Sequence, residues 1–271
     1  MGFETIVERI KTLPPLPESV RKLEELFLHG DPDMKAIVSV IESDPVLTAD
    51  ILAKVNAPIY SYSKQIVAVM QAVTLFGLGV VRGMVLRSSM EKNFDIDMSP
   101  YGIASEELSK ISSMQSALMF QWYMGVDVQK ARILVPVAFL MEMGKVVIAK
   151  ELIESSYGDI FCDELKKSDS IEAVEREFTD TTSAGVSAML FKQWFFDETF
   201  IGIMEQLDTS GDVTPEYVDM VNAMKVVRTA VNIKEQMSDK SIEEAAKLVE
   251  ELGYESKRFI NAANRVRDKF I

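Results

Sequence analysis

The chain has 271 residues, of which 48% are hydrophobic and 26% charged, a balance typical of a soluble globular protein. Its 42 acidic residues outnumber its 29 basic ones, and the net charge of −13 repels nucleic-acid backbones and anionic lipid, so we expect neither as a partner. A single histidine, His29, and a single cysteine, Cys162, exclude most zinc and iron sites and most Ser-His or Cys-His catalysis.

The expected location is the cytoplasm. One cysteine cannot form an intrachain disulfide, which indicates a reducing compartment. Residues 1–13 carry acids where a signal peptide has a basic region and an apolar core. The most apolar stretch, residues 133–149, is interrupted by Pro136, Glu142 and Lys145, so we interpret it as buried helix and not as a membrane span.

Helical periodicity dominates the chain and strand alternation is scarce, so the predicted fold class is all-α. The first helices are expected over residues 3–13 and 18–28, then after Asp31-Pro32-Asp33 and after Ser43-Asp44-Pro45. Each Asp-Pro pair offers a side-chain cap followed by a proline suited to the first helical position. His29 falls in a turn between two of these helices, where a surface position is expected.

Residues 67–90 are predicted to form one or two buried helices, interrupted near Gly77 and Gly79, where a sharp turn or a close helix approach becomes possible. The acidic segment 93–102 has a proline and a glycine and no helical period, so it is the predicted lobe boundary. The predicted architecture is two packed helical lobes, residues 1–92 and 104–271, joined by a connecting segment at 93–103.

The second lobe is predicted to contain at least eight helices. They are expected near residues 104–124, 129–155, 170–178, 181–193, 197–207, 214–237, 241–252 and 256–270. A capping box at residues 241–244 is expected to begin the next-to-last helix. Trp122 and Trp194, each beside other aromatic residues, are expected to anchor the core, and the segment around Glu175 is expected to be an exposed helix face.

Five short motifs follow one another at compact spacings in the first half of the chain. They are Leu13-Pro14-Pro15-Leu16-Pro17, Asp31-Pro32-Asp33, Ile41-Glu42-Ser43-Asp44-Pro45-Val46-Leu47-Thr48, Leu52-Ala53-Lys54-Val55-Asn56-Ala57 and Gln71-Ala72-Val73-Thr74-Leu75-Phe76-Gly77. In this order the series closely resembles the HDOD domain, a bacterial signalling module, over roughly residues 13–207. The same residues also have structural roles, since the prolines fix a turn and Asn56 can close a helix.

The HDOD domain is similar to the metal-dependent HD phosphohydrolases, in which His and Asp residues hold a metal that activates water. The resemblance places the Leu-Leu-His-Asp-Ile-Gly-Lys motif of those enzymes on residues 139–145, with Met141 at the histidine and Glu142 at the aspartate. A later motif falls on residues 182–188, with Ser183 at its histidine. An upstream histidine falls near Ser112 or Ser113, and a further histidine pair falls on the segment that starts at Gln206.

Thioether and hydroxyl groups replace imidazole poorly on a divalent ion, and one carboxylate cannot hold a catalytic metal alone. The resemblance therefore implies that hydrolysis is lost, and no residue is predicted to be catalytic, to bind a cofactor or to ligate a metal. Ser112, Met141, Glu142, Ser183 and Gln206 are predicted only to line a degenerate pocket.

Glu142 has three alternative roles. It can form a structural pair with Lys145 at i+3, lie partly exposed at a lobe interface, or ligate a metal. The last predicted helix carries the only basic cluster of this acidic chain, either as a solvated face or as a docking site for an acidic partner. The cluster consists of Lys257, Arg258, Arg265, Arg267 and Lys269.

Three functions remain open at this point. The first is a non-catalytic signalling module that binds an unknown protein partner of its pathway. The second is a residual metal-dependent phosphohydrolase with unusual ligands. The third is a sensor in which the degenerate pocket binds a small ligand such as a nucleotide. The sequence does not define the oligomeric state.

Overall fold

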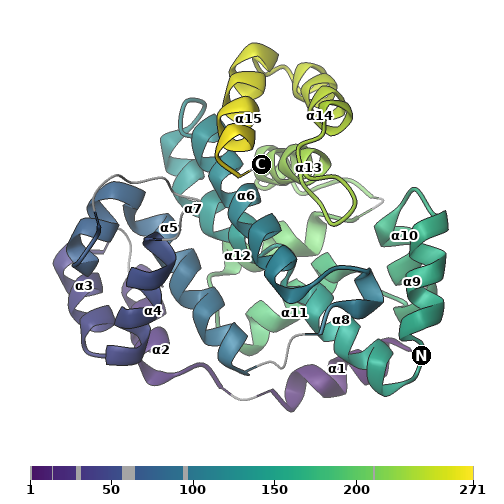
Figure 1. The fold of residues 1–271 in the computed structure, drawn as a ribbon, viewed down its shortest axis with the longest axis horizontal. Helices are drawn as coiled ribbons and strands as arrows, with labels where there is room; N and C mark the ends of the chain where they lie inside the picture. The colour runs from purple at the N-terminus through teal and green to yellow at the C-terminus, as the bar shows by residue number, and fades with distance from the viewer. Residues whose placement is uncertain are drawn as a thin grey trace.

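The computed structural model describes residues 2–13, 15–28, 32–56, 65–93, 97–209 and 211–270. Within these ranges the chain forms α-helices, one short 3-10 helix and no β-strand, so the all-α fold class is confirmed (Figure 1). The helices of the first half are α1 (Phe3–Lys11), α2 (Glu18–Leu28), α3 (Met34–Glu42), α4 (Pro45–Val55) and α5 (Val69–Asn93). The predicted turn at His29 lies outside the described residues.

The elements of the second half run in chain order from η2 to α15. They are η2 (Ser99–Tyr101), α6 (Ser105–Tyr123), α7 (Val128–Leu140), α8 (Met143–Glu154), α9 (Gly158–Lys167), α10 (Ile171–Thr179), α11 (Ser183–Gln193), α12 (Glu198–Gln206), α13 (Val218–Ala230), α14 (Asp239–Glu251) and α15 (Ser256–Phe270).

Both Asp-Pro segments of the first half supply a helix cap, but only Asp44-Pro45 does so in the predicted way; at α3 the cap is Asp33, the residue after Pro32. The Asp33 side chain accepts from the Lys35 backbone at the start of α3, and Asp44 accepts from two backbone N–H groups at the start of α4, where Pro45 takes the first helical position. Asn56 then closes α4: its amide donates to Leu52 O at 2.8 Å and to Ile66 O at 2.7 Å. Helices α2 to α5 gather on one side of the molecule (Figure 1).

Helix α1 lies away from α2–α5 and packs on α8 and α11 (Figure 1). Its amphipathic pattern buries Ile6 and Ile10 against these helices. On the rim of the contact, the Arg9 guanidinium binds Glu151 at 2.6 Å and Glu154 at 2.5 Å. Helix α1 therefore contacts α8 and α11, whereas α5, at the other end of segment 1–92, contacts α7. The division of the chain into two lobes remains a prediction.

Glycines set the course of α5 as the sequence analysis predicted. Gly77 takes a φ of 80° and kinks the helix. A Cβ at Gly79 would lie 3.1 Å from the carbonyl oxygen of Arg132, and one at Gly83 would lie 3.2 Å from the Cβ of Phe139. Helix α5 therefore rests almost directly on the backbone of α7.

Helix α5 is also, among the described residues, the one helix long and apolar enough to cross a membrane by length and composition. Its candidate window, Val69–Ser89, is 56% buried inside the protein, in contact with α4 and α7. This burial is typical of the core helix of a globular protein.

A buried ion pair joins α5 to α2 and lies against a ring of the second half of the molecule. The Arg82 Nε donates to Glu24 on α2 at 2.9 Å, and both side chains are almost wholly buried. The guanidinium is also 4.3 Å from the ring centroid of Phe27 and 4.5 Å from that of Phe200 on α12. A planar, weakly hydrated guanidinium suits such a position between a carboxylate and two rings.

The prediction of one continuous helix over residues 129–155 is wrong. Residues 128–154 form two helices, α7 and α8, separated at Met141 and Glu142. Pro136 lies inside α7 and does not cause the break. The sequence analysis also missed α9, which is strongly amphipathic with Phe161 and Leu165 buried.

Two further boundaries differ from the expectation. The helix predicted over residues 214–237 is limited to α13, and the following residues turn back through an isolated bridge between Val231 and Gln236. The cap of α14 is Ser238, whose side chain accepts from Ser241 N, so the predicted capping box at 241–244 is wrong. Ser241 is instead buried, and its hydroxyl donates to Ala230 O at 3.0 Å.

The aromatic anchors are confirmed with one exception. Trp122 on α6 is fully buried and makes edge contacts with Tyr254 and with Phe259 on α15, at ring-centroid distances of 5.9 and 5.3 Å. Trp194 is buried as well, but its neighbour Phe195 is 82% exposed. Aromatic packing thus holds α15 against α6.

Helices α8 and α11 cross so closely at Gly144 that no side chain fits between them. A Cβ there would lie 1.9 Å from the carbonyl oxygen of Ser183 and 2.9 Å from Ser187 N, both backbone atoms that cannot rotate away. We expect Gly144→Ala to destabilise the fold by ~3 kcal/mol or more. Urea denaturation checks this against Gly211→Ala, where the nearest atom is 3.8 Å away and little change is expected. Equal stability of the two variants would contradict the contact.

Candidate functional site

At the break between α7 and α8, the backbone of Met141 and of Gly144 contacts α11. Met141 is buried at the C-terminus of α7, and its carbonyl oxygen accepts from the Ser187 hydroxyl at 3.2 Å. The same hydroxyl accepts from Gly144 N at 2.8 Å, which fixes the start of α8. The turn therefore points Glu142 and Lys145 into the interior instead of along a helix surface.

Lys145 occupies the centre of the interior polar cluster. Its Nζ lies 3.0 Å from Glu142 Oε2 and 3.2 Å from Glu175 Oε1, and it donates to Ser183 Oγ at 2.6 Å. Glu142, Lys145 and Ser183 are each about 2% exposed, and Glu175 is fully buried. The predicted i+3 pair of Glu142 and Lys145 is confirmed, and a second carboxylate from α10 completes it.

Each carboxylate has further donors besides the ammonium. Gln115 Nε2 on α6 donates to Glu142 Oε1 at 2.7 Å and to Val231 O at 2.9 Å. The Tyr101 hydroxyl donates to Glu175 Oε1 at 3.0 Å, and the backbone N–H of Ser183 donates to Glu175 Oε2 at 2.6 Å. A buried charge is tolerated when its partner and its hydrogen bonds are all present, and this cluster meets that condition.

The mutual attraction of these charges outweighs their burial. Burial alone would raise the pKa of Glu142, but the Lys145 ammonium and the Gln115 amide lower it below the ordinary value. Burial alone would likewise lower the pKa of Lys145, yet Glu142 and Glu175 raise it above its ordinary value. At neutral pH Glu142 and Lys145 are therefore both charged. The neighbouring Tyr101 hydroxyl has its pKa raised by burial and by the charge of Glu175, so it stays a donor.

The five residues predicted to line a pocket are not all brought together. Met141, Glu142 and Ser183 meet at the turn between α7 and α8. Ser112 lies on α6, one helical turn before Gln115, and its hydroxyl accepts a hydrogen bond from Arg87 of α5. Gln206 lies apart, because its Oε1 accepts from Thr214 N at 2.6 Å and its amide donates to Gly202 O. The space around Met141, Glu142 and Ser183 is filled by their own side chains and by Lys145.

Sequence reasoning missed Glu175, and its expectation that this residue lies on an exposed face is wrong. Glu175 follows Val174, four residues after Ile171 and three before Phe178, so it lies on the apolar side of α10. A carboxylate on the apolar side of an amphipathic helix will be buried, and a buried carboxylate needs a cation to pair with it. Gln115 and Tyr101 gave no comparable signal.

A second ion pair adjoins the buried cluster and opens to solvent. Arg228 on α13 binds Asp208 Oδ1 at 2.5 Å and lies 3.6 Å from Glu172. Burial would raise the pKa of Asp208, but Arg228 lowers it. Both residues line a polar cleft of about 1140 Å³ between α10, α13 and α14.

The donor set does not fit a divalent metal. Both carboxylates of the cluster already bind an ammonium, and the remaining groups are a thioether and hydroxyls. Across the described ranges, no three His, Cys, Asp or Glu side chains are grouped so that they could hold a metal ion. We therefore derive no step through a metal.

The described residues form an all-helical protein with a buried ion cluster at the turn between α7 and α8. A family model for the HDOD domain matches residues 13–209, and the chain belongs to the HDOD family. The predicted resemblance, with its range of 13–207, is confirmed. Comparison with functionally curated proteins gives no match.

Solved structures share this fold. A virulence factor from Campylobacter jejuni is 24% identical, with 98% of this chain and 96% of that one covered and a TM-score of 0.60. A protein from Shewanella amazonensis whose name proposes a phosphohydrolase is 13% identical, with 98% and 95% covered and a TM-score of 0.73. A protein from Marinobacter aquaeolei whose name proposes a signal transduction protein is 16% identical, with 98% and 62% covered and a TM-score of 0.73.

Removing the ammonium should reverse the pH dependence of the cluster. In the native chain the lowered pKa of Glu142 gives stability that is present above about pH 4.3 and lost as the pH falls through the folded value. Lys145→Met leaves two buried carboxylates unpaired, so we expect a loss of ~3–5 kcal/mol at neutral pH. Burial then raises their pKa, so this variant should gain stability from pH 7 to pH 5, as measured by urea denaturation.

Lys11→Met is the matched control, because Lys11 pairs with Glu8 at 2.7 Å on the exposed surface of α1. We expect it to cost under ~1 kcal/mol at either pH. A Lys145→Met variant that matches this control, or that loses stability on mild acidification, would contradict the charged cluster.

Proposed function

We propose that this chain is a non-catalytic module of bacterial signal transduction that acts in the cytoplasm by binding another protein. One observation carries the proposal: the Lys145 ammonium lies between Glu142 and Glu175, next to Ser183. The family resemblance assigns Glu142 and Ser183 to positions where HD hydrolases hold a metal. A lysine supplies the positive charge that a metal would bring, but it cannot polarise a water for attack on phosphate.

The surroundings of the cluster support loss of hydrolysis in a second way. A phosphate ester and its attacking water need an open site, whereas Glu142, Lys145 and Ser183 are almost completely buried. Entry of a divalent ion would have to displace a buried ammonium from two carboxylates, with the cost of leaving that ammonium unpaired. The name of the Marinobacter aquaeolei structure agrees with a signalling role and adds no residue-level evidence.

A metal titration combined with a hydrolysis assay tests this proposal. We expect isothermal titration with Mg²⁺, Mn²⁺ or Zn²⁺ to give no stoichiometric binding, and turnover of bis-p-nitrophenyl phosphate and cyclic di-GMP to equal that of Glu142→Gln. The variant is the matched control because it removes the charge at the family's aspartate position and keeps the shape. Stoichiometric metal together with turnover that Glu142→Gln abolishes would overturn the proposal.

The polar cleft favours a second candidate function, the sensing of a small anionic ligand. The cleft is at least as large as the ~300–1,000 Å³ of common ligand sites, and Arg176, Lys225 and Lys240 lie on its lining. If it binds a nucleotide, ligand at 100 times its Kd should stabilise the chain by ~2.7 kcal/mol. A thermal-shift screen with nucleotides, repeated on Lys240→Glu, measures this. No shift across the panel would eliminate the sensor.

A further inference from the structure

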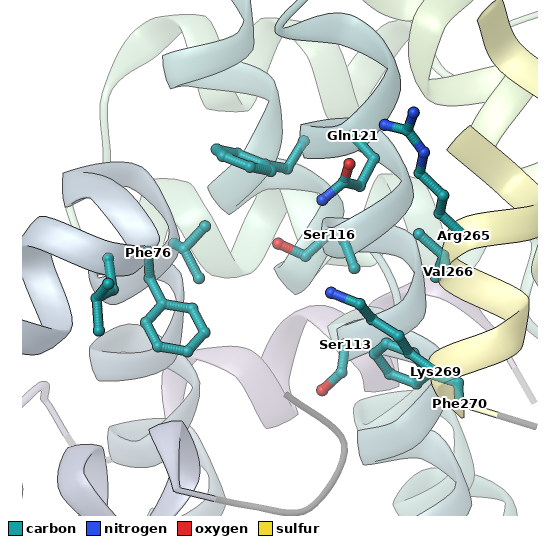
Figure 2. A pocket seen from close by; sticks show the side chains of 12 residues that line it. Phe76, Ser113, Ser116, Gln121, Arg265, Val266, Lys269 and Phe270 are labelled. Atoms are coloured by element: carbon teal, nitrogen blue, oxygen red, sulfur yellow. The ribbon is translucent and has the colours of Figure 1, made fainter. Parts of the chain in front are cut away.

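Helices α5, α6 and α15 enclose a small hollow. None of the charged residues of the buried cluster around Lys145 lines it. Its lining is mainly apolar, with three neutral polar side chains from α6, Ser113, Ser116 and Gln121, among them (Figure 2). The apolar residues are Leu75, Phe76, Val80, Ala117, Phe120, Val266 and Phe270. The hollow measures about 100 Å³. It joins the kinked helix of the first half to the last helix of the chain.

Two cations stand at the edge of this mainly apolar lining. Arg265 and Lys269 are one helical turn apart on α15, both exposed, and Figure 2 shows their side chains reaching from α15 toward α6. Neither has an ion pair or hydrogen bond within the described part of the chain. By contrast, Arg258 binds the backbone of Gly125, and Arg267 binds Asp239 at 2.6 Å. Within the described residues, three members of the basic cluster of α15 have no ion pair or hydrogen bond, and two of these three, Arg265 and Lys269, line the hollow; the third, Lys257, lies outside it.

The size of the hollow selects what fits it. Drug-sized ligands occupy ~300–1,000 Å³, which is well above this volume. A cavity of ~150 Å³ accommodates a benzene ring, so about 100 Å³ suits one branched aliphatic side chain such as leucine. Pockets that take a single apolar anchor are typical of the centre of protein interfaces.

The charges select the surroundings of that anchor. The chain as a whole carries −13, so an acidic partner is repelled over most of its surface. Arg265 and Lys269 provide a local exception next to the apolar lining, where a carboxylate gains a charge-assisted hydrogen bond. Placement of an apolar side chain in the hollow would bring flanking residues of the same peptide to these two cations.

We propose that the hollow between α5, α6 and α15 binds an acidic peptide segment of a partner protein. One leucine-sized side chain of the segment fills the hollow, and a neighbouring Asp or Glu binds Arg265 and Lys269. This inference rests on the proposed function, because it names the chemistry of the partner that a non-catalytic module would bind. It assigns the interaction to a surface hollow whose lining does not include Glu142, Lys145, Glu175 or Ser183 of the buried cluster.

Selection of a phage-displayed random peptide library on the full chain tests the proposal. We expect enriched peptides to place Asp or Glu beside Leu, Ile or Val. A fluorescein-labelled synthetic copy of the most enriched peptide then reports affinity by anisotropy. Lys269→Glu should weaken its binding ~10-fold or more, and added NaCl should weaken it further in the native chain. Ala117→Leu, which fills the hollow, should cause a comparable loss.

Matched controls separate the site from general effects. Lys257→Glu makes the same charge change on an exposed position of α15 outside the hollow, and Ala49→Leu makes the same side-chain change on the surface of α4. Both should bind within about twofold of the native chain, and melting curves confirm that all four variants fold. Circular dichroism and a melting curve show whether Ala117→Leu is folded. If it is not, the comparison of Lys269→Glu with Lys257→Glu tests the proposal by itself.

Two results would overturn the proposal. One is a library without enrichment of acidic, apolar peptides, and the other is an enriched peptide that Lys269→Glu and Lys257→Glu bind equally well. Neither result affects the proposed loss of hydrolysis, which the metal titration and phosphodiester assay decide. Conversely, turnover that depends on Glu142 would remove the proposed function while leaving peptide binding at the hollow measurable.

Discussion

The ammonium of Lys145 is the interaction on which the interior arrangement depends. Lys145 lies on α8, and its two carboxylates come from the turn that precedes α8 and from α10. The remaining hydrogen bonds of these carboxylates come from α6, α11 and η2. Because each group left unpaired would cost several kcal/mol, these five elements are bound to one relative position. The close crossing at Gly144 brings α8 near enough to α11 for the ammonium to reach Ser183.

Local chemistry made much of the fold predictable. The aspartate caps of α3 and α4, the kink at Gly77 and the pairing of Glu142 with Lys145 each depend on residues within a few positions of one another. Such interactions follow from side-chain type and helical spacing alone. The family motifs added the location of the site, because they aligned Met141 and Ser183 with the histidines of related enzymes.

The rest of the site depends on contacts between residues far apart in the chain. Glu175 reaches Lys145 across 30 positions, and Gln115 reaches Glu142 across 27. No periodicity specifies such pairs, so Glu175 was assigned to the surface and Gln115 was not considered. The break between α7 and α8 could not be predicted for a related reason, because the apolar run of residues continues through it. The turn is held by hydrogen bonds of the Ser187 hydroxyl on α11 with Met141 O and Gly144 N.

The contact of α5 with α7 at Gly79 and Gly83 bears on how this protein can carry a message. A Cβ at Gly79 would meet the Arg132 carbonyl oxygen at 3.1 Å, and one at Gly83 would meet Phe139 at 3.2 Å, so neither position has room for a larger side chain. The two halves are therefore in close contact along this stretch of α5 and α7. A partner seated in the hollow would contact α5, which makes this close contact with α7, and α15 at the end of the chain, so a single bound peptide would bridge the two halves of the molecule.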